Sequence, residues 1–354
     1  ELFLLRMSLA LEVAKTKAQS DDKIYKPDRE AEIVEKRSAG MEEELQLKYV
    51  SLLQSMIRAS REYQYSEILR QTPEKFPFYP AETLAKPKTV FYQGSGRNQE
   101  LAARALFPSC EPQNVPTWEQ VFQSVRDGKA DIGVVPVENT TAGTVSEVYD
   151  LLLDYDLYIN RSYIKKISHC LAAVPGTKLE DVKRVCSHPH ALPQCHSFIS
   201  EHDLEAIEVA NTAIAAQNVQ KKGDKSLLPL PQEAAVRYGL DILAEGINDM
   251  QHNETRFIAV SKRDLQPEDN RIEIAFHIPN ASGTLITVLD TIAHYGIDMT
   301  EIHSRPLKDS PWCYVFYVDF TGNMRDHAVQ SLLYQLHEEL PYIKVIGSYC
   351  VPNE

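Results

Sequence analysis

Hydrophobic residues follow three different patterns along the chain, and each pattern predicts a different class of fold. Over residues 1–72 they recur at the three- and four-residue spacing of a helix face, with few Gly or Pro residues. Residues 88–265 alternate short β-branched runs with helical stretches, which is typical of α/β domains. Residues 266–354 predict the order strand, helix, strand, strand, helix, strand of a ferredoxin-like α+β domain. The chain is therefore predicted to be multidomain.

The first segment is predicted to be an all-α bundle of three amphipathic helices, each with one apolar stripe. The stripe residues are Leu2, Leu5, Leu9, Val13, Ile33, Val34, Tyr49, Leu52, Leu53, Met56 and Ile57. Residues 73–87 contain four prolines, which predict a semi-extended linker. The bundle is thus expected to be separate from the α/β domain that follows.

Six polar residues have the spacing of a site inside this bundle. They are Arg6, Lys17, Arg29, Glu30, Ser60 and Gln64. Arg6 and Lys17 lie about three helical turns apart, so both cations share one helix face. Such a set could enclose a compact dianion, and solvated charges on the bundle surface are the alternative.

The stretch from residue 131 to 145 has the features of a ligand site at a strand end. Residues 132–137 form a short apolar run, typical of a strand buried on both faces. Glu138, Asn139 and Thr140 follow directly, and open α/β sheets bind small ligands at the carboxyl ends of their strands. A strand followed by an ordinary helix N-cap is the alternative.

A second lobe is predicted to begin near residue 168, with a final strand near residue 255 that returns to the first lobe. This alternation predicts a two-lobed α/β domain with its ligand in the cleft. Three histidines at positions 188, 190 and 196 lack the carboxylate or thiol spacing of a metal site, so no metal is expected.

Composition narrows the possible partners and the compartment. The net charge of -13 argues against nucleic acid and anionic membrane surfaces as partners. No apolar run approaches the roughly 20 residues that span a bilayer, and a soluble, cytoplasmic protein is expected. The six cysteines are scattered, so free thiols are predicted. Because the chain begins at Glu1 within an apolar helical pattern, a missing preceding segment is also expected.

The first segment resembles the all-helical chorismate mutase domain of bacterial bifunctional chorismate mutase/prephenate dehydratases, also called P-proteins. The matching motifs are F-L-L-R, L-E-V-A-K-T-K, Y-K-P-D-R-E and S-R-E-Y-Q. The resemblance implies that Lys17 and Gln64 stabilise charge on the ether oxygen of chorismate. It also implies that Arg6 and Arg29 hold carboxylates, that Glu30 binds the ring hydroxyl and that Ser60 contacts the substrate. Lys26 stands where the family usually has Asp, which leaves a weakened or silent mutase as an alternative.

Residues 88–263 resemble prephenate dehydratase. The motifs, in the family's order, are Y-Q-G, P-V-E-N-T, S-H-P-x-A-L-x-Q-C, N-T-A-x-A-A, Y-G-L-x-I-L and N-E-T-R-F. The resemblance implies loss of carbon dioxide and hydroxide from prephenate, driven by aromatisation and without a cofactor or metal. It implies that Thr255 is catalytic and that Asn139 and Thr140 line the same cleft.

The same resemblance supplies the expected substrate-binding residues. They are Glu138, Ser187, His188, Gln194, Thr212, Arg256 and Phe257. For Arg256, a structural buried ion pair is an equal alternative. The chain departs from the family pattern at residues 96–99 and at 226–232, where two prolines replace a small-residue strand.

The last segment resembles the ACT regulatory domain, which in related dehydratases binds phenylalanine between paired domains. The expected effector-binding residues are Gly283, Thr284, Leu285, His303, Ser304, Arg305 and Pro306. The family more often has Ala at position 284 and Glu at position 303, so the strength of feedback is expected to differ. A homodimer or homotetramer is expected.

Together these resemblances predict a bifunctional enzyme of phenylalanine biosynthesis that converts chorismate through prephenate to phenylpyruvate under phenylalanine control. The predicted domains are residues 1–72, a linker at 73–87, the dehydratase at 88–265 and the ACT domain at 266–354. A catalytically silent amino-acid sensor and an arogenate dehydratase are the alternatives. Because Thr255 lies shortly before the regulatory domain, effector binding is expected to act on the last catalytic strand.

Overall fold

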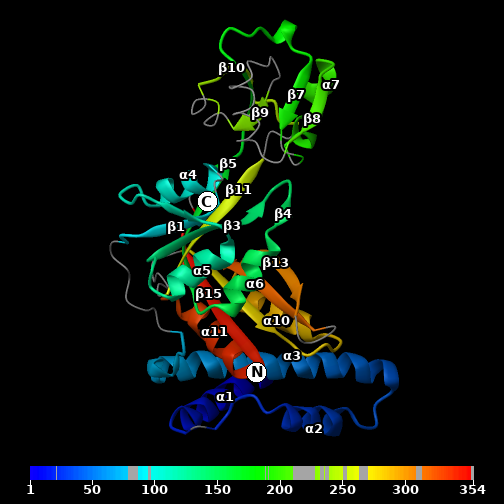
Figure 1. Ribbon diagram of the computed structural model, residues 1–354. Helices are drawn as coiled ribbons and strands as arrows, with labels where there is room; N and C mark the ends of the chain where they lie inside the picture. Colours follow the sequence, from blue (N-terminus) through cyan, green and yellow to red (C-terminus); the bar gives the residue numbers. More distant parts are fainter. Residues whose placement is uncertain are drawn as a thin grey trace.

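The computed structural model describes most of the chain in three regions stacked along one axis (Figure 1). The described residues are 1–20, 22–78, 87–94, 97–187, 189, 191–209, 228–231, 235, 239–249, 253–262, 270–307 and 313–351. In Figure 1 the helical region lies at the base, the C-terminal domain above it, and the two lobes of the α/β domain above that. None of the described helices is long and apolar enough to cross a membrane.

The helical region contains the three predicted helices, α1 (Leu2–Ala18), α2 (Pro27–Ser38) and α3 (Glu43–Gln71). The predicted inward stripe is wrong for α1, because Leu2 and Leu9 are 84% and 60% exposed while Ala10, Ala14 and Ala18 are buried. These alanines are four residues apart and form one small-residue face. Small side chains let helices pack closely, and α1 packs against α3.

The first lobe of the α/β domain contributes six strands to a ten-stranded sheet, five of them in one continuous row. In spatial order these strands are β5 (Tyr158–Lys166), β11 (Glu254–Ser261), β3 (Ile132–Asn139), β1 (Val90–Gln93) and β2 (Gln113–Val115). A short strand, β4 (Gly143–Thr144), pairs with β3. Three helices pack on this lobe, and they are α4 (Arg97–Leu106), α5 (Trp118–Arg126) and α6 (Ser146–Asp154). Residues 132–137 are fully buried, which confirms the predicted strand.

The second lobe is smaller and is built from two short sheets. One has the order β10 (Asp241–Glu245), β6 (His169–Ala173), β9 (Leu228–Pro231), and the other pairs β7 (Arg184–Ser187) with β8 (Glu205–Glu208). Helix α7 (His196–Glu201) follows β7 in the chain. The two prolines of β9 therefore lie at a sheet edge, the position that tolerates missing N–H donors.

The C-terminal domain has the predicted ferredoxin-like order. Its elements are β12 (Arg271–His277), α10 (Thr284–His294), β13 (Met299–Pro306), β14 (Tyr314–Thr321), α11 (His327–Glu339) and β15 (Tyr342–Tyr349). The strand order is β13-β14-β12-β15, and β15 joins β5 of the first lobe at the pair Gly347 and Ile159. A Cβ at Gly347 would lie 2.6 Å from the Ile159 carbonyl oxygen, so this approach requires glycine.

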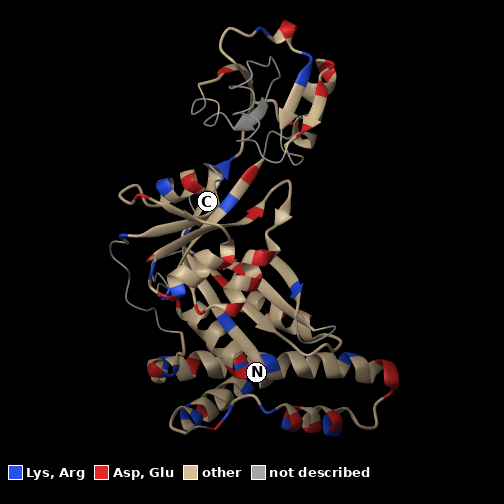
Figure 2. Cartoon of the chain, in the orientation of Figure 1, with Lys and Arg blue, Asp and Glu red and all other residues tan. Residues whose placement is uncertain are grey.

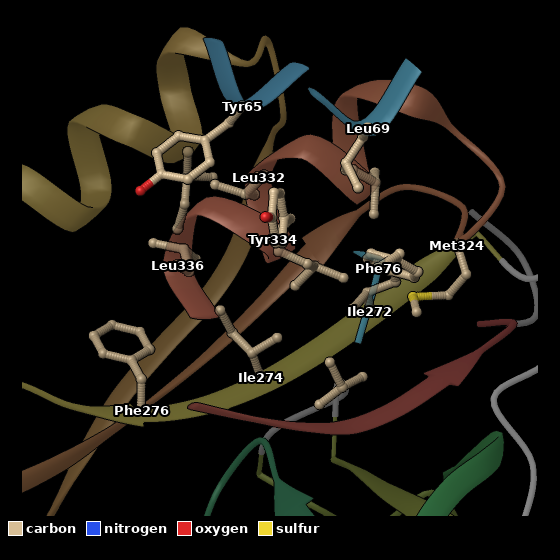
Figure 3. Packing of buried hydrophobic residues seen from close by; sticks show 14 of the residues in the cluster. Tyr65, Leu69, Phe76, Ile272, Ile274, Phe276, Met324, Leu332, Tyr334 and Leu336 are labelled. Atoms are coloured by element: carbon tan, nitrogen blue, oxygen red, sulfur yellow. The ribbon is translucent and has the colours of Figure 1, made fainter. Parts of the chain in front are cut away.

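One hydrophobic cluster includes residues of both the helical region and the C-terminal domain (Figure 3). Tyr65 and Leu69 of α3 and Phe76 share this cluster with Leu332 and Tyr334 of α11. The rings of Tyr65 and Tyr334 meet edge to face, with centroids 5.6 Å apart. The long helix α3 thus forms part of the core of the C-terminal domain.

Candidate functional site

The ends of two neighbouring strands bring Asn139 and Thr255 together. Antiparallel pairing of β3 with β11 sets Thr255 opposite Asn139. Nδ2 of Asn139 donates to Oγ1 of Thr255 at 2.9 Å. Its Oδ1 accepts from the backbone N–H groups of Thr141 and Ala142, at 3.0 and 2.8 Å. The amide is therefore fixed on one side by its own turn, and its donors face the start of β11.

Thr140 fixes the same turn against β11 from the other side. Its backbone N–H donates to the carbonyl of Glu254 at 2.9 Å, and its Oγ1 accepts from the Glu254 N–H at 3.0 Å. Asn139, Thr140 and Thr255 therefore lie together, and the cleft that they are expected to line stays a prediction.

A hydrogen-bond network extends from these residues into the second lobe through Asn253. This buried residue lies where the chain crosses between the lobes, and its carbonyl accepts from the N–H of Ile167 on the other crossing segment. Asn253 Oδ1 accepts from Asn139 Nδ2 at 2.9 Å, and Asn253 Nδ2 donates to Gln194 Oε1 at 3.0 Å. The amide of Asn253 therefore links the two lobes directly.

His169 completes the network from the second lobe. Its Nε2 lies 3.0 Å from Gln194 Oε1, which can only accept, so the ring donates from Nε2. Burial lowers the pKa of His169, which favours the neutral ring. The sequence motifs included Asn253, but neither Asn253 nor His169 was predicted as a site residue.

Arg256 lies among carboxylates at the junction with the C-terminal domain. Its Nη1 is 3.2 Å from Asp319, and its Nη2 contacts Glu301 and lies 3.7 Å from Glu138. Acidic residues gather around α6 and β13 in this region (Figure 2). These contacts favour the structural ion pair over binding of a substrate carboxylate.

A fully buried acid, Glu273, belongs to the same cluster. Burial and the charge of Asp319 raise its pKa to about 8, and Tyr349 donates to it at 3.3 Å. Phe257 is 2% exposed and belongs to the core of the first lobe, so it supports the strand without facing the cleft. Ser187 is buried at the end of β7. His188 and Thr212 lie outside the described residues.

The six polar residues of the helical region fall into two groups. One group is Arg6, Ser60 and Gln64, and the other is Lys17, Arg29 and Glu30. Arg6 Nε donates to Ser60 Oγ at 3.0 Å, and Gln64 Nε2 donates to the Ser60 carbonyl at 3.1 Å. Burial, followed by the charges of nearby Lys26 and Arg29, lowers the pKa of the Lys17 ammonium. Glu30 is paired with Arg61, a residue that the sequence did not indicate.

The seven predicted effector residues are divided between two faces of the C-terminal sheet. Gly283, Thr284 and Leu285 line a hollow of about 400 Å³ at the start of α10. Gly283 has φ of 84°, a left-handed conformation that suits glycine before the helix. Among the described residues that line this hollow, positions 303–306 do not occur.

His303 and Arg305 instead face the first lobe. The ring of His303 lies between those of Tyr149 and Tyr317, with centroid distances of 4.1 and 4.8 Å. Arg305 forms an ion pair with Asp150 of α6 at 3.2 Å. Ser304 is exposed on the edge strand β13. Ser304 pairs with Phe316 and Pro306 with Tyr314, and both partners line the hollow. Ser304 and Pro306 therefore lie on the same face of the sheet as the hollow, whereas His303 and Arg305 lie on the opposite face.

Comparison with known proteins agrees with this arrangement. A family model described as prephenate dehydratase matches residues 90–265, and one described as chorismate mutase type II matches residues 1–65. The bifunctional chorismate mutase/prephenate dehydratase of Stutzerimonas stutzeri is 32% identical over 271 residues, which are 75% of this chain and 74% of that protein. The chain belongs to this bifunctional family. It is accordingly an enzyme that combines a chorismate mutase module with a prephenate dehydratase domain.

Other relatives match a similar share of the chain. Arogenate dehydratase/prephenate dehydratase 1 of Arabidopsis thaliana is 35% identical over 279 residues, which are 73% of this chain and 71% of that protein. The structure of prephenate dehydratase from Arthrobacter aurescens, solved in complex with L-Phe, aligns with a TM-score of 0.66 at 29% identity. It covers 74% of this chain and 90% of that one.

The chemistry available at this site follows from the contact between Asn139 and Thr255. Because Oγ1 of Thr255 accepts a hydrogen bond from Asn139, its own proton is available for a second acceptor. The hydrogen bond that Thr255 accepts from Asn139 also polarises its O–H group and so makes it a stronger hydrogen-bond donor. Within the described residues, no group of three or more His, Cys, Asp or Glu side chains could hold a metal ion.

Proposed function

We propose that the surface formed by Asn139, Thr140 and Thr255 is the site where prephenate loses carbon dioxide and hydroxide. The observation that carries the proposal is the network through Asn139 and Asn253, which fixes the Thr255 hydroxyl and links both lobes. In this reaction the bond to the ring carboxylate breaks, its electron pair enters the ring, and the ring C–O bond breaks. The Thr255 hydroxyl donates a hydrogen bond to the departing oxygen.

A threonine hydroxyl is a weak acid, so full proton transfer from it at neutral pH is unfavourable. Polarisation of the leaving group, or passage of a proton through the hydroxyl, fits the geometry better than simple donation. Aromatisation supplies the driving force, and no electron-sink cofactor is needed. Gln194 of the second lobe, with Glu138, Ser187, His188 and Thr212, is proposed to contact the substrate.

For the mutase module, the proposed roles are those of its family. Lys17 and Gln64 stabilise the ether oxygen, Arg6 and Arg29 hold the two carboxylates, and Glu30 binds the ring hydroxyl, with Ser60 between Arg6 and Gln64. The hydrogen bonds among Arg6, Ser60 and Gln64 support this assignment. The pKa of Lys17 is lowered chiefly by its partial burial, and a bound anionic substrate would favour its charged form.

The C-terminal domain is proposed to be an ACT domain that binds phenylalanine and regulates the enzyme. The hollow beside Gly283, Thr284 and Leu285 has a size suited to one amino acid, and a related dehydratase was solved with L-Phe. Positions 303–306 are proposed to act across a paired domain. The exposed stripe of α1 and the exposed Ile302 on β13 support a homodimer or homotetramer. The domain limits at residues 72, 87 and 265 and a cytoplasmic location stay predictions.

Arogenate is the second candidate substrate, because relatives at 35% identity carry arogenate dehydratase in their names. One experiment separates these possibilities. The purified chain is supplied with chorismate, prephenate or arogenate, each with and without phenylalanine, and product formation is followed. Phenylpyruvate from both chorismate and prephenate is expected. If prephenate is converted but chorismate is not, the proposed mutase activity is wrong. A higher kcat/KM for arogenate than for prephenate would favour arogenate as the substrate. If no substrate is converted, the chain is better explained as a catalytically silent amino-acid sensor.

A further inference from the structure

Arg61 of α3 connects two carboxylates that come from different domains. One is Glu30 of α2 in the mutase module, and the other is Glu339 at the end of α11 in the C-terminal domain. Arg61 Nε lies 3.0 Å from Glu339 Oε1, and Nη2 donates to Oε2 at 3.3 Å. The guanidinium also lies 4.6 Å from the centroid of the Tyr25 ring. Since the side chain is about 10% exposed, these contacts hold the guanidinium in one orientation.

The contact with Glu30 bears directly on the mutase site. Arg61 follows Ser60 in α3 and precedes Gln64 by three residues, so it occupies the same stretch of helix as two proposed substrate contacts. A carboxylate has two oxygens, and Arg61 engages Oε2 of Glu30. The other oxygen is left to accept a hydrogen bond from a substrate hydroxyl. Arg61 therefore sets the direction of the Glu30 carboxylate.

The contact with Glu339 continues as a chain of hydrogen bonds into the C-terminal domain. Gln335 Nε2 donates to Glu339 Oε1 at 3.1 Å, and Gln335 is fully buried. Its Oε1 accepts from the hydroxyl of Tyr295 at 3.0 Å. Tyr295 immediately follows α10, the helix whose first residues line the proposed effector hollow. A continuous path of polar contacts thus joins the mutase carboxylate Glu30 to the effector helix.

We propose that Arg61 is a positioning residue of the mutase site, and that Glu339, Gln335 and Tyr295 tie its orientation to α10 of the regulatory domain. The inference rests on the proposed mutase function. It makes the regulatory domain a structural part of the mutase site, because the partner that orients Arg61 belongs to α11. Movement of α10 on effector binding then reaches Glu30 without passing through the dehydratase cleft.

The first test removes Arg61 without leaving a buried carboxylate unpaired in the other domain. The double variant Arg61→Met with Glu339→Gln is compared with Arg58→Met, which breaks the ion pair with Asp290 across the same interface but does not touch Glu30. The mutase kcat/KM of the double variant is expected to fall by about tenfold or more, which is typical when a group that orients a catalytic side chain is removed. Its dehydratase kcat is expected to stay within twofold of the wild type. Arg58→Met is expected to leave both activities unchanged. Equal mutase activity in all three proteins overturns the proposal.

A binding measurement separates failure of this inference from failure of the proposed function. A bicyclic ether dicarboxylate that mimics the rearranging conformer of chorismate is titrated by calorimetry. Tight binding by the wild type and weaker binding by the double variant supports the positioning role even at low turnover. Equal binding overturns it. If the wild-type protein neither binds this probe nor converts chorismate, the proposed mutase function is wrong, and the positioning role of Arg61 is wrong with it.

The link to α10 is tested with Tyr295→Phe, which keeps the ring and removes the hydroxyl. The basal mutase activity of Tyr295→Phe is expected to stay within twofold of the wild type. In a separate variant, Arg61→Lys keeps the charge without the planar guanidinium, and its mutase activity is expected to lie between those of the double variant and the wild type. The effect of phenylalanine on the mutase is expected to shrink at least about threefold in Tyr295→Phe, with its effect on the dehydratase unchanged. An unaltered phenylalanine effect on the mutase, or none in the wild type, overturns the link.

Discussion

Replacing Thr255 with valine tests the dehydratase site most directly, because valine keeps the shape of threonine and removes only the hydroxyl. A hydrogen-bond donor that faces charge developing in the transition state contributes typically 10²–10³ in kcat, or about 2.7–4 kcal/mol of transition-state stabilisation. Thr255→Val is therefore expected to lower the kcat for prephenate by at least about a hundredfold.

The effect on stability is expected to be much smaller. Asn139 Nδ2 lies 2.9 Å from Asn253 Oδ1 and 3.0 Å from the Glu254 carbonyl, so both of its hydrogens keep an acceptor when Oγ1 is lost. The variant then loses one ordinary hydrogen bond, at a cost of about 0.5–1.5 kcal/mol in the free energy of unfolding. The catalytic loss should exceed the stability loss by about 1 kcal/mol or more.

Two measurements decide the matter, phenylpyruvate formation from prephenate and urea unfolding followed by circular dichroism. Thr255→Ser serves as the matched control, since it keeps the hydroxyl and is expected to stay within about tenfold of the wild-type kcat. A Thr255→Val protein that retains more than about a tenth of the wild-type kcat would refute the role of the hydroxyl. So would a serine variant as inactive as the valine variant.

Three further outcomes follow from the junction between the domains. Arg256→Met should destabilise the fold by about 1.5–3 kcal/mol, because it removes the cation that Glu301 and Asp319 share, while the KM for prephenate stays unchanged; a raised KM at unchanged stability contradicts the ion-pair assignment. Because the folded-state pKa of Glu273 is raised to about 8, the folded protein holds a proton that the unfolded chain loses near pH 4 to 5, so stability should fall between about pH 5 and 8. Glu273→Gln should remove this fall in the free energy of unfolding, which is on the order of 1 kcal/mol per pH unit. Urea unfolding of both proteins at several pH values measures it, and the same pH dependence in both would exclude a raised pKa of Glu273. Gly347→Ala should cost about 1–3 kcal/mol, because the new Cβ meets the backbone of Ile159, and an unchanged thermal midpoint would argue against the close contact.

Sequence patterns predicted the elements well where large apolar residues alternate with clear breaks. The buried strand expected at residues 132–137 lies within β3, and the six elements of the C-terminal domain follow in the expected order. The proximity of Asn139 and Thr255 was also predicted, although 116 residues separate them. In that case motifs shared with a known family supplied the long-range information that periodicity lacks.

The patterns failed where small residues or distant partners decide the packing. The inward face of α1 is made of alanines, and a search for large apolar residues selected the exposed leucines instead. Arg61 could not be identified, because its two carboxylate partners lie 31 and 278 residues away. Nothing in the local sequence distinguishes it from a solvated surface arginine. Asn253 was missed for a similar reason, since its importance comes from its place between the lobes.

The shared cluster around α3 limits how freely this protein can be divided. Tyr65, Leu69 and Phe76 cover apolar residues of α11, including Leu332 and Tyr334. A chain cut after the helical module would leave this surface in water and would tend to self-associate. In evolutionary terms, separating the mutase from the dehydratase requires polar replacements on α11, so fission of the gene and redesign of the C-terminal domain are expected to occur together.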